Sequence, residues 1–336
     1  MNEKKEFPFV SVILVTHNEQ EYVRDALLSL INQTYPKDKY EIIIVDGMSS
    51  DKTLDIVSEL IEIYSSNLFA IKVIRNEKKI LAAGWNLGIK QSKGKYVVRI
   101  DAHAKANNNF LMKNVETMLR ISDVVCVGGK LKTEVSKDSN GIVSKVLSSP
   151  FGVGNSSFRV SDVEGYADTA VYGLYKKEIF EKIGYFDERY IRNQDIELHS
   201  RIKKIGGKFY FNPQISCTYY ARNTVKKMCR QAYGNGKWNM VLLKNHKSAL
   251  SLRHLIPFVF VIFLLTTFVG GFFNNNIWKL EIAVVILHMI LGIIAASKKT
   301  SMIYEIIQMP FLFLALHISY GCGYFSGLLI NNIKEK

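Results

Sequence analysis

Acidic residues are missing from one long stretch of this 336-residue chain, and cysteine and proline are scarce throughout it. Four cysteines without a CxxC pair argue against a disulfide scaffold and a cysteine zinc site, and six prolines exclude a collagen-like or proline-rich chain. No Asp or Glu occurs from Leu198 to Leu280, whereas twelve Lys and Arg lie from Arg201 to Arg253. The net charge of +14 is therefore concentrated before the hydrophobic end, unlike that of a generally basic nucleic-acid binder.

Two phosphate-binding motifs and a secretion signal are also absent. No GxxxxGK[ST] occurs, which excludes a P-loop, and no GxGxxG follows a predicted strand, which leaves a dehydrogenase-type fold without support. The apolar run from Val10 to Val15 is shorter than the core of a secretory signal, and polar residues follow it at once. We therefore expect the N-terminal domain to stay in the cytoplasm.

Three long apolar runs follow the basic stretch. His254 to Phe273 has twenty residues without a formal charge, enough to cross a hydrocarbon core of about 30 Å as a helix. Leu280 to Ser297 carries only Glu281, and Ile306 to Ile333 carries no charge but contains Pro310. The third run crosses the membrane, re-enters it or lies at its surface, so two or three spans remain open. Three successive runs disfavour the alternative of buried core helices in a soluble protein.

The positive-inside rule orients this membrane region. The twelve cations precede the first apolar run, and Lys298 and Lys299 follow the second one. Both groups lie on the cytoplasmic side if the first two runs cross. We therefore expect a multi-pass protein of the cell membrane with its N-terminal domain in the cytoplasm.

Short β-branched runs alternate with helical stretches in the first 220 residues. Strands are predicted at residues 10–15, 41–46, 71–75, 96–101 and 124–129, and helices near 20–32, 52–64, 80–91 and 108–119. This order predicts an α/β fold with a mostly parallel, Rossmann-like sheet and flanking helices. In such sheets, ligands bind beyond the carboxyl ends of the strands.

Polar clusters directly follow three of these strands. They are Thr16 to Glu19, Asp46 to Asp51, and Asp101 to His103. Turn formation and helix capping explain any one cluster, but three clusters at one sheet edge favour a binding site. Asp101 and His103 can converge on one ion, and a carboxylate with an imidazole suits Mn²⁺ or Mg²⁺ with a diphosphate completing the shell.

From about Phe9 to Asn212 the chain resembles the family 2 glycosyltransferases. The resemblance is carried by the ordered segments VSVILVTHNEQEYVRDALLSLINQTYP, EIIIVDGMSSDKT, LAAGWNLGI, RIDAHA and FDERYIRNQDIELHSRIKKIGGKFYFNP. It implies the GT-A fold and a metal-dependent, inverting hexosyl-type transfer from a nucleotide-diphospho-sugar, with a UDP-sugar as the expected donor. The implied acceptor is lipid-linked, in the biosynthesis of a cell-surface polysaccharide such as an exopolysaccharide or capsule.

The resemblance also implies roles for single residues. Donor binding is implied for Thr16, Asn18, Glu19, Asp46, Ser49, Asp51, Asn86 and Asp101, metal binding for Asp101 and His103, catalysis as general base for Asp195, and acceptor contact for Asp168 and Gln194. Two positions depart from the family pattern. His103 replaces the second Asp of the metal motif, and Gln194 replaces the Glu that usually precedes the base.

The segment around Asp195 also allows plainer interpretations. Asp195 begins a predicted helix, so it caps that helix or acts as a base, and the helix dipole favours its charged form. Glu197 is four residues before Arg201, which predicts a surface ion pair. His199 is expected to be an exposed helix residue, or else to orient Asp195. Asp168 is either a turn residue or an acceptor contact.

We therefore predict three regions. Residues 1–222 form the cytoplasmic GT-A domain, residues 223–252 form a basic amphipathic segment at the membrane surface, and residues 253–333 form two or three transmembrane helices. The expected partners are a nucleotide-sugar, a lipid-linked acceptor and membrane lipids, with no nucleic acid. One rival hypothesis is a catalytically silent nucleotide-sugar-binding scaffold. Another is a processive polysaccharide synthase that extrudes its polymer, but two or three spans are few for the channel that it would need.

Overall fold

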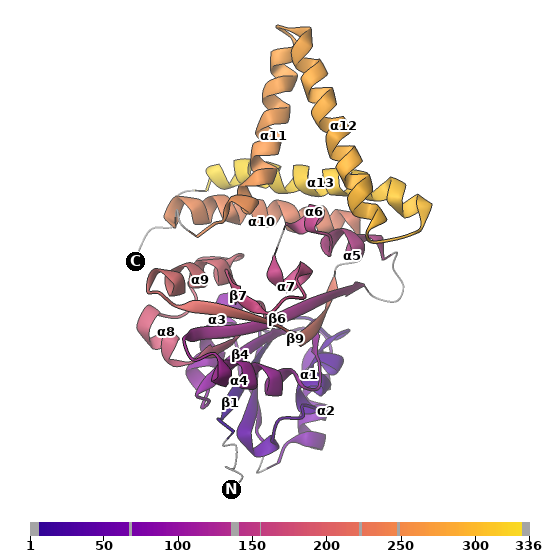
Figure 1. Cartoon of the computed structure of the whole chain (residues 1–336). Helices are drawn as coiled ribbons and strands as arrows, with labels where there is room; N and C mark the ends of the chain where they lie inside the picture. Colours follow the sequence, from indigo (N-terminus) through magenta and orange to yellow (C-terminus); the bar gives the residue numbers. More distant parts are fainter. Residues whose placement is uncertain are drawn as a thin grey trace. The chain divides into compact units, whose positions relative to one another are not determined.

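A computed structural model describes residues 7–66, 69–135, 141–154, 156–221, 224–246 and 249–330 (Figure 1). The chain forms two compact units. The sheet unit comprises residues 1–132 and 161–219, and the helical unit comprises residues 133–160 and 220–336. Residues 141–154 and 156–160, which lie inside the first predicted region, therefore group with the C-terminal helices.

Four parallel strands form one half of the sheet. They are β1 (Val10–Thr16), β2 (Tyr40–Asp46), β3 (Ile71–Arg75) and β4 (Tyr96–Asp101), paired in the order β3-β2-β1-β4. Every residue of β1 and β2 is buried, because helices cover both faces of this half. These strands confirm the predicted runs.

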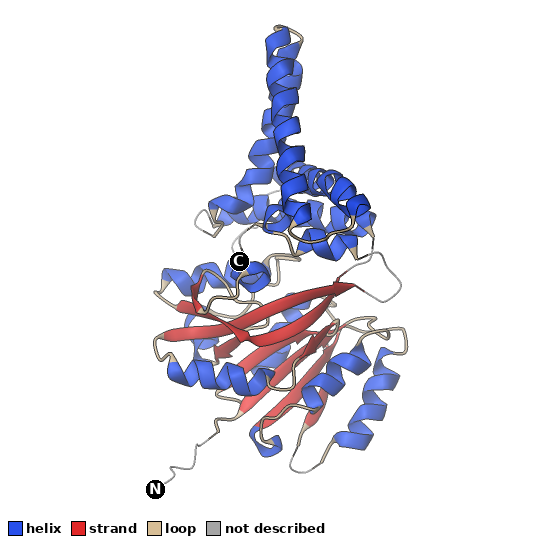
Figure 2. Cartoon of the chain, turned by 45° about the vertical axis from the view of Figure 1, so that its right-hand side comes forward, coloured by secondary structure: helices blue, strands red, loops and turns tan. Residues whose placement is uncertain are grey.

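The other half of the sheet is antiparallel, so the whole sheet is mixed. It contains β5 (Ala104–Ala106), β6 (Val124–Val135), β7 (Gly165–Ala167), β8 (Leu174–Lys176) and β9 (Lys208–Ala221). Strand β8 pairs antiparallel with β4 and β6, and β9 pairs antiparallel with β5 and β7. Figure 2 shows the resulting curved sheet in red.

Helices flank this sheet on both faces. They are α1 (Val23–Ile31), α2 (Thr53–Tyr64), α3 (Leu81–Gln91), α4 (Phe110–Arg120), α8 (Glu178–Ile183) and α9 (Gln194–Lys204), with a short 3-10 helix, η1 (Lys37–Lys39). The core contains Ile13, Ile43 and Trp85. A Cβ at Gly88 of α3 would lie 2.5 Å from Ile13 Cγ2, so glycine is needed for α3 to lie this close to β1.

The described residues of the helical unit form three short and four long helices. These are α5 (Ile142–Leu147), α6 (Pro150–Val153), α7 (Ser157–Val160), α10 (Val225–Asn245), α11 (Leu252–Gly271), α12 (Asn275–Ser297) and α13 (Ile303–Leu328). Helices α11, α12 and α13 are long and apolar enough to cross a membrane. Within this unit, α11 and α12 form a hairpin, whereas α13 lies across the base of that hairpin and along α10 (Figure 1).

Helices α10 and α13 run parallel and in close contact. A Cβ at Gly236 of α10 would overlap the carbonyl of Tyr320 in α13, and one at Gly323 would overlap the carbonyl of Tyr233. At the far end, Lys244 Nζ donates hydrogen bonds to the carbonyl oxygens of Gly327, Leu328 and Ile330, at 3.2, 2.6 and 2.9 Å. A lysine thus satisfies the last carbonyl groups of α13.

Candidate active site

The loops after β1 and β2 are joined by hydrogen bonds. The register of the parallel strands places Thr16 opposite Asp46. The Asp46 carboxylate accepts hydrogen bonds from the Ser49 backbone N–H at 3.0 Å and from the Ser49 hydroxyl at 2.6 Å. Asn18 donates its backbone N–H to Ser49 Oγ at 2.9 Å and accepts one from the Ser50 N–H at 2.8 Å. Five of the implied donor residues therefore lie together in one cluster, which we call the β2-end cluster: Thr16, Asn18, Asp46, Ser49 and Asp51.

Asp51 fastens the same two loops from the other side. Its carboxylate accepts hydrogen bonds from the Thr53 N–H (3.0 Å), the Thr53 hydroxyl (2.5 Å) and the Gln20 N–H (3.2 Å). Burial acts to raise the pKa of Asp51, but the bonds from Thr53 and Gln20 outweigh it and lower that pKa. Asn18 and Met48 both have left-handed backbones, with φ of 53° and 62°. Such a conformation is unusual for Met, so the hydrogen-bonded loops hold it in place.

A second group, the β4-end cluster, consists of Glu19, Asp101, His103 and Tyr172. His103 Nδ1 lies 3.0 Å from Glu19 Oε1, and His103 Nε2 lies 4.0 Å from Asp101 Oδ2. The buried Tyr172 donates its hydroxyl to Asp101 Oδ2 at 3.1 Å. The Glu19 backbone N–H also bonds to Thr53 Oγ1 at 2.8 Å, so Glu19 connects the two clusters.

The β4-end cluster fits a divalent ion that takes part of its coordination shell from a substrate. Asp101 and His103 supply one carboxylate and one imidazole, and both side chains are partly exposed. Across the described ranges, no group of three or more His, Cys, Asp and Glu side chains is arranged to hold a metal by itself. A Mn²⁺ or Mg²⁺ ion here would therefore need phosphate oxygens and water as further ligands.

Asp195 lies in the first turn of α9 and faces Arg99 of β4. Its Oδ1 accepts the Ile196 backbone N–H at 2.9 Å, and its Oδ2 lies 3.6 Å from Arg99 Nη2. The Asp195 side chain is 38% exposed, whereas that of Arg99 is only 10% exposed. Asp195 is thus open to a substrate on one side and faces a buried cation on the other.

The Arg99 guanidinium is enclosed by aromatic rings. Its carbon lies 4.9 Å from the centre of the Trp85 ring and 5.3 Å from that of Phe186. Burial acts to lower the pKa of Arg99, but Tyr175 and the carboxylates of Asp195 and Asp101 together have the larger, opposite effect. The pKa of Arg99 is therefore raised, and this cation stays protonated. Arg99 is therefore a fixed positive charge inside the sheet unit, close to both acidic groups.

Asn86, an implied donor residue, hydrogen bonds to the segment that leads to Asp195. Its Oδ1 accepts the Phe186 N–H at 2.9 Å, and its Nδ2 donates to the Phe186 carbonyl at 2.9 Å and to Glu188 Oε1 at 3.1 Å. Asn86 is buried, and these bonds join α3 to the segment after α8. Its side chain thus fixes the position of Phe186.

The predicted exposure of two side chains in α9 is wrong, although the predicted ion pair between Glu197 and Arg201 is present. Glu197 is buried rather than at the surface, and it forms a two-pronged ion pair with Arg201 at 2.6 and 2.7 Å. His199 is also buried, with its ring nitrogens 2.7 Å from the Thr169 and Tyr175 hydroxyls. Burial lowers the pKa of His199 to about 3, so its ring is neutral. Helical spacing showed which residues share a face but not what covers that face.

The two implied acceptor residues differ in burial. Asp168 is exposed, directly before Thr169, whose hydroxyl bonds to His199. Gln194 is buried, directly before Asp195.

Two residues of the site were not predicted from the sequence. They are Arg99 and Tyr172, which lie next to Asp195 and Asp101 respectively. Arg99 shares a strand face with Asp101 because the two are two residues apart, and this was the one signal that pointed to it.

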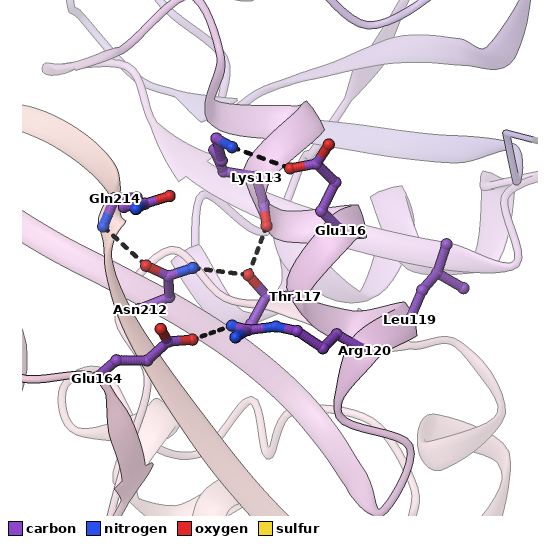
Figure 3. Close-up of a pocket in the computed structure, with 8 residues that line it drawn as sticks. All are labelled: Lys113, Glu116, Thr117, Leu119, Arg120, Glu164, Asn212 and Gln214. Carbon is purple, nitrogen blue, oxygen red and sulfur yellow. Dashed lines mark hydrogen bonds and ion pairs between the residues drawn. The ribbon is translucent and has the colours of Figure 1, made fainter. Parts of the chain in front are cut away.

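A pocket in the sheet unit lies away from both clusters (Figure 3). It has a volume of about 550 Å³ and is formed by α4, Glu164 and the part of β9 that carries Asn212 and Gln214. Its cations already have acidic partners, since Lys113 pairs with Glu116 and Arg120 pairs with Glu164. This pocket shares no residue with the candidate site.

A mixed sheet with polar clusters at the carboxyl ends of its parallel strands is the fold of a GT-A glycosyltransferase. The family model described as "Glycosyl transferase family 2" matches residues 11–184. The chain therefore belongs to this family and is a glycosyltransferase.

Three similar proteins illustrate this membership. A dolichyl N-acetyl-alpha-D-glucosaminyl phosphate 3-beta-D-2,3-diacetamido-2,3-dideoxy-beta-D-glucuronosyltransferase from Methanococcus voltae is 35% identical, over 98% of this chain and 99% of that protein. The succinoglycan biosynthesis protein ExoA from Rhizobium meliloti is 25% identical over 73% of each chain. The mannosyltransferase PcManGT from Pyrobaculum calidifontis, solved with GDP-Man and Mn²⁺, is 17% identical with a TM-score of 0.61, covering 94% of this chain and 88% of that one. This last likeness confirms the fold.

Proposed function

We propose that the protein transfers a sugar, with inversion and with a divalent metal, from a nucleotide-diphospho-sugar to a lipid-linked acceptor at the cytoplasmic face of the membrane. One observation carries this proposal. A partly exposed carboxylate, Asp195, lies beside β4, the strand that ends in Asp101 and leads to His103. This arrangement brings a base and a candidate metal site to one sheet edge.

Asp195 is the proposed general base. The acceptor hydroxyl attacks the anomeric carbon on the face opposite to the diphosphate, and Asp195 takes the proton of that hydroxyl as the new bond forms. The bond to the nucleoside diphosphate breaks in the same step, which inverts the configuration. Asp101 and His103 would hold the metal, which when bound neutralises charge on the departing diphosphate.

The β2-end cluster is the proposed nucleoside site, and UDP is the expected nucleotide. Asp46, Ser49 and Asn18 already have fixed orientations, since Asp46 bonds to Ser49 and Asn18 bonds to Ser49 and Ser50 of the other loop. Thr16 is buried, and its carbonyl accepts the Gly47 N–H at 2.8 Å, so it supports the loop rather than facing solvent. With the nucleoside in this cluster, the diphosphate of the donor would extend toward Asp101.

The acceptor is proposed to be a sugar on a polyprenyl phosphate carrier. The Methanococcus voltae relative acts on a dolichyl phosphate sugar by its name, and the likeness extends over nearly the whole of both chains. The apolar helices of the helical unit support an acceptor that resides in the membrane. Polysaccharide biosynthesis is further supported by the likeness to ExoA.

We propose that α11 and α12 cross the membrane and that α13 lies in its plane. Helix α11 has 20 residues, or about 30 Å of helix, which matches the hydrocarbon core. The turn between α11 and α12 carries exposed Phe272 and Phe273 and nearby Trp278, as is typical of a membrane interface. Cations gather at the opposite end of the hairpin, at Arg253, Lys298 and Lys299.

Helix α13 cannot cross without α10, because the two helices are in contact along most of their length. Helix α10 carries Lys226, Lys227, Arg230, Lys237 and Lys244, and burying these cations in hydrocarbon is unfavourable. Exposed apolar residues of α13 recur on one face, at Ile307, Phe311, Ile318 and Phe325. An in-plane helix presents such a stripe to the lipid boundary while its other face packs on protein.

Nucleoside diphosphate release tests the proposed activity. Full-length protein in detergent would be given a panel of nucleotide sugars with and without Mn²⁺, together with lipid-linked acceptors extracted from the source membranes. We expect metal-dependent release with one donor and inversion at the anomeric carbon of the product. Donor binding without release, with an acceptor set shown to contain the native lipid, would instead support the silent scaffold.

Tags at the two chain ends test the membrane arrangement. Two spans place both tags on one side of a sealed vesicle, and that side is the cytoplasmic one. Three spans place them on opposite sides. Protease accessibility in right-side-out and inverted vesicles distinguishes the two arrangements, and opposite sides would contradict an in-plane α13.

A further inference from the structure

We propose that Arg99 is a positioning residue that fixes the orientation of the Asp195 carboxylate for proton transfer. The inference rests on the proposed role of Asp195 as base. Arg99 exposes 9% of its surface and lies on β4, two residues before Asp101. It therefore acts from inside the sheet unit rather than by contact with substrate.

The contact between Arg99 and Asp195 is suited to this role. The Nη2 to Oδ2 distance of 3.6 Å is too long for a hydrogen bond but close enough for strong attraction between opposite charges. Oδ1 is occupied by the Ile196 N–H. Oδ2 is thus attracted to a cation without giving up its lone pairs, and it can still accept a proton from an acceptor hydroxyl.

The guanidinium is held at this distance by its surroundings. The rings of Trp85 and Phe186 limit its movement, and its Nε has no hydrogen-bond partner among the described residues. Burying a cation is unfavourable unless opposite charge lies nearby, and Asp195 is its ion-pair partner in the described part of the chain. A residue that served packing alone would not require that charge.

Asn86 completes this arrangement. It hydrogen bonds to both backbone groups of Phe186, and it directly follows Trp85 in α3. The Asn86 side chain thus fixes the backbone of Phe186, and Asn86 is the chain neighbour of Trp85, so it holds both residues whose rings contact Arg99. This gives Asn86 an indirect role, through Phe186 and Arg99, in placing Asp195.

Kinetics of Arg99 variants test the inference in the full-length enzyme. In Arg99→Met we expect kcat to fall by roughly 10- to 100-fold, the range found for residues that hold functional groups in place, with an unchanged KM for the donor. A fall in kcat at an unchanged donor KM is the result expected when a residue positions the base rather than binds the donor. Arg99→Lys, which keeps a positive charge at this place, should restore part of kcat.

Three comparisons make the result decisive. Arg24→Met removes an arginine from an exposed ion pair with Glu59 and should leave kcat unchanged. If Arg99→Met does not fold, as judged by its melting temperature, Arg99→Gln provides a second neutral side chain with polar character. An unchanged kcat in a folded neutral variant would overturn the inference, as would a loss that appears only in the donor KM.

The Asp195→Asn variant separates this inference from the proposed function. Loss of transfer in Asp195→Asn with full activity in Arg99→Met would leave the base in place and reject the role of Arg99. Full activity in Asp195→Asn would reject the base itself, and with it any role of Arg99 that acts through Asp195.

Discussion

The two polar clusters at the carboxyl edge of the sheet differ in how many hydrogen bonds the protein itself supplies to their carboxylates. In the β2-end cluster, Asp46 and Asp51 each accept at least two hydrogen bonds, from Ser49 and from Thr53 and Gln20 respectively. In the β4-end cluster, Asp101 accepts one bond from Tyr172, while His103 contacts Glu19 through Nδ1 and places Nε2 4.0 Å from Asp101. The first cluster is a closely hydrogen-bonded pair of loops, whereas the second places a partly exposed carboxylate and imidazole side by side.

Under the proposed function, this difference separates binding from chemistry. Fixed hydrogen bonds would orient the nucleoside end before the donor arrives, so less conformational freedom would be lost on binding. The partly exposed carboxylate and imidazole at the other end are the groups that we assign to the metal. Each prediction below removes a group from one cluster, or from the helix that carries Asp195, and asks whether this division holds.

The largest effect is expected from Asp195→Asn. An amide cannot take the acceptor proton, so kcat should fall by about 10²- to 10⁴-fold, while donor affinity stays the same. Product formation and calorimetric donor binding would be measured side by side. Asp162→Asn, which changes an exposed aspartate in an ion pair with Lys130, is the matched control. Weaker donor binding with unchanged kcat would assign Asp195 to binding instead.

Arg201→Met should strongly destabilise the fold around α9. It leaves the buried Glu197 carboxylate without its partner, which costs about 3–5 kcal/mol in comparable sites. Arg201 also donates to the carbonyl oxygens of Ile183 and Tyr185, so the segment before Asp195 would loosen. Thermal unfolding in detergent measures the loss. The double variant Glu197→Gln with Arg201→Met should recover part of it, and no recovery would mean that the carboxylate is not the cause.

His103→Ala should raise the Mn²⁺ concentration needed for half-maximal activity by about 10- to 100-fold. The imidazole is one of two protein groups that we assign to the metal, so its loss weakens binding without removing the site. His103→Asp restores a second carboxylate and should remain metal-dependent near the original concentration. An unchanged Mn²⁺ requirement in the alanine variant would exclude His103 as a ligand.

The smallest effect is expected from Asp51→Asn, in the β2-end cluster. The loss of this loop and helix-end contact should cost about 0.5–2 kcal/mol at neutral pH. Because the pKa of Asp51 is lowered in the folded state, its charge stabilises the protein above the usual aspartate range, near 3.9, and this contribution disappears as the pH falls through the lowered value. The melting temperatures of the wild-type protein and of Asp51→Asn should therefore differ at pH 7, and this difference should become smaller at pH 3. A constant difference would show that the charge is not involved.

The parallel half of the sheet was predictable from sequence because its strands are continuous β-branched runs at regular intervals. In the antiparallel half, only β6 was predicted, since the run at residues 124–129 forms its first part. Strands β7 and β8 have three residues each, too few to show any periodicity. Residues 133–160 carry no long apolar run, so nothing in their composition predicted that they belong to the helical unit.

The candidate site was predictable to a similar degree. Polar residues at strand ends indicated both clusters, since the carboxyl ends of parallel strands meet at one edge. The surroundings of Arg99, Glu197 and His199 were not visible, because a charged residue in a strand or helix reads as exposed unless its buried partner is known. The two hydroxyl partners of His199 lie 30 and 24 residues before it. Asp195 is distant from Arg99 in the sequence, and Arg201 lies across the helix face from Glu197, so only the folded chain shows these surroundings.

The spacing of the strands sets one dimension of this enzyme. Asp46 ends β2, Asp101 ends β4, and β1 lies between them, so the backbones of these two residues are separated by two inter-strand spacings, or about 10 Å. Backbone pairing fixes that separation, and no side-chain substitution in the strands will alter it. If the proposed nucleoside site is correct, a change of nucleobase during evolution, or by design, is confined to the loops after β1 and β2, while the backbone distance between the two ends of the donor site stays constant.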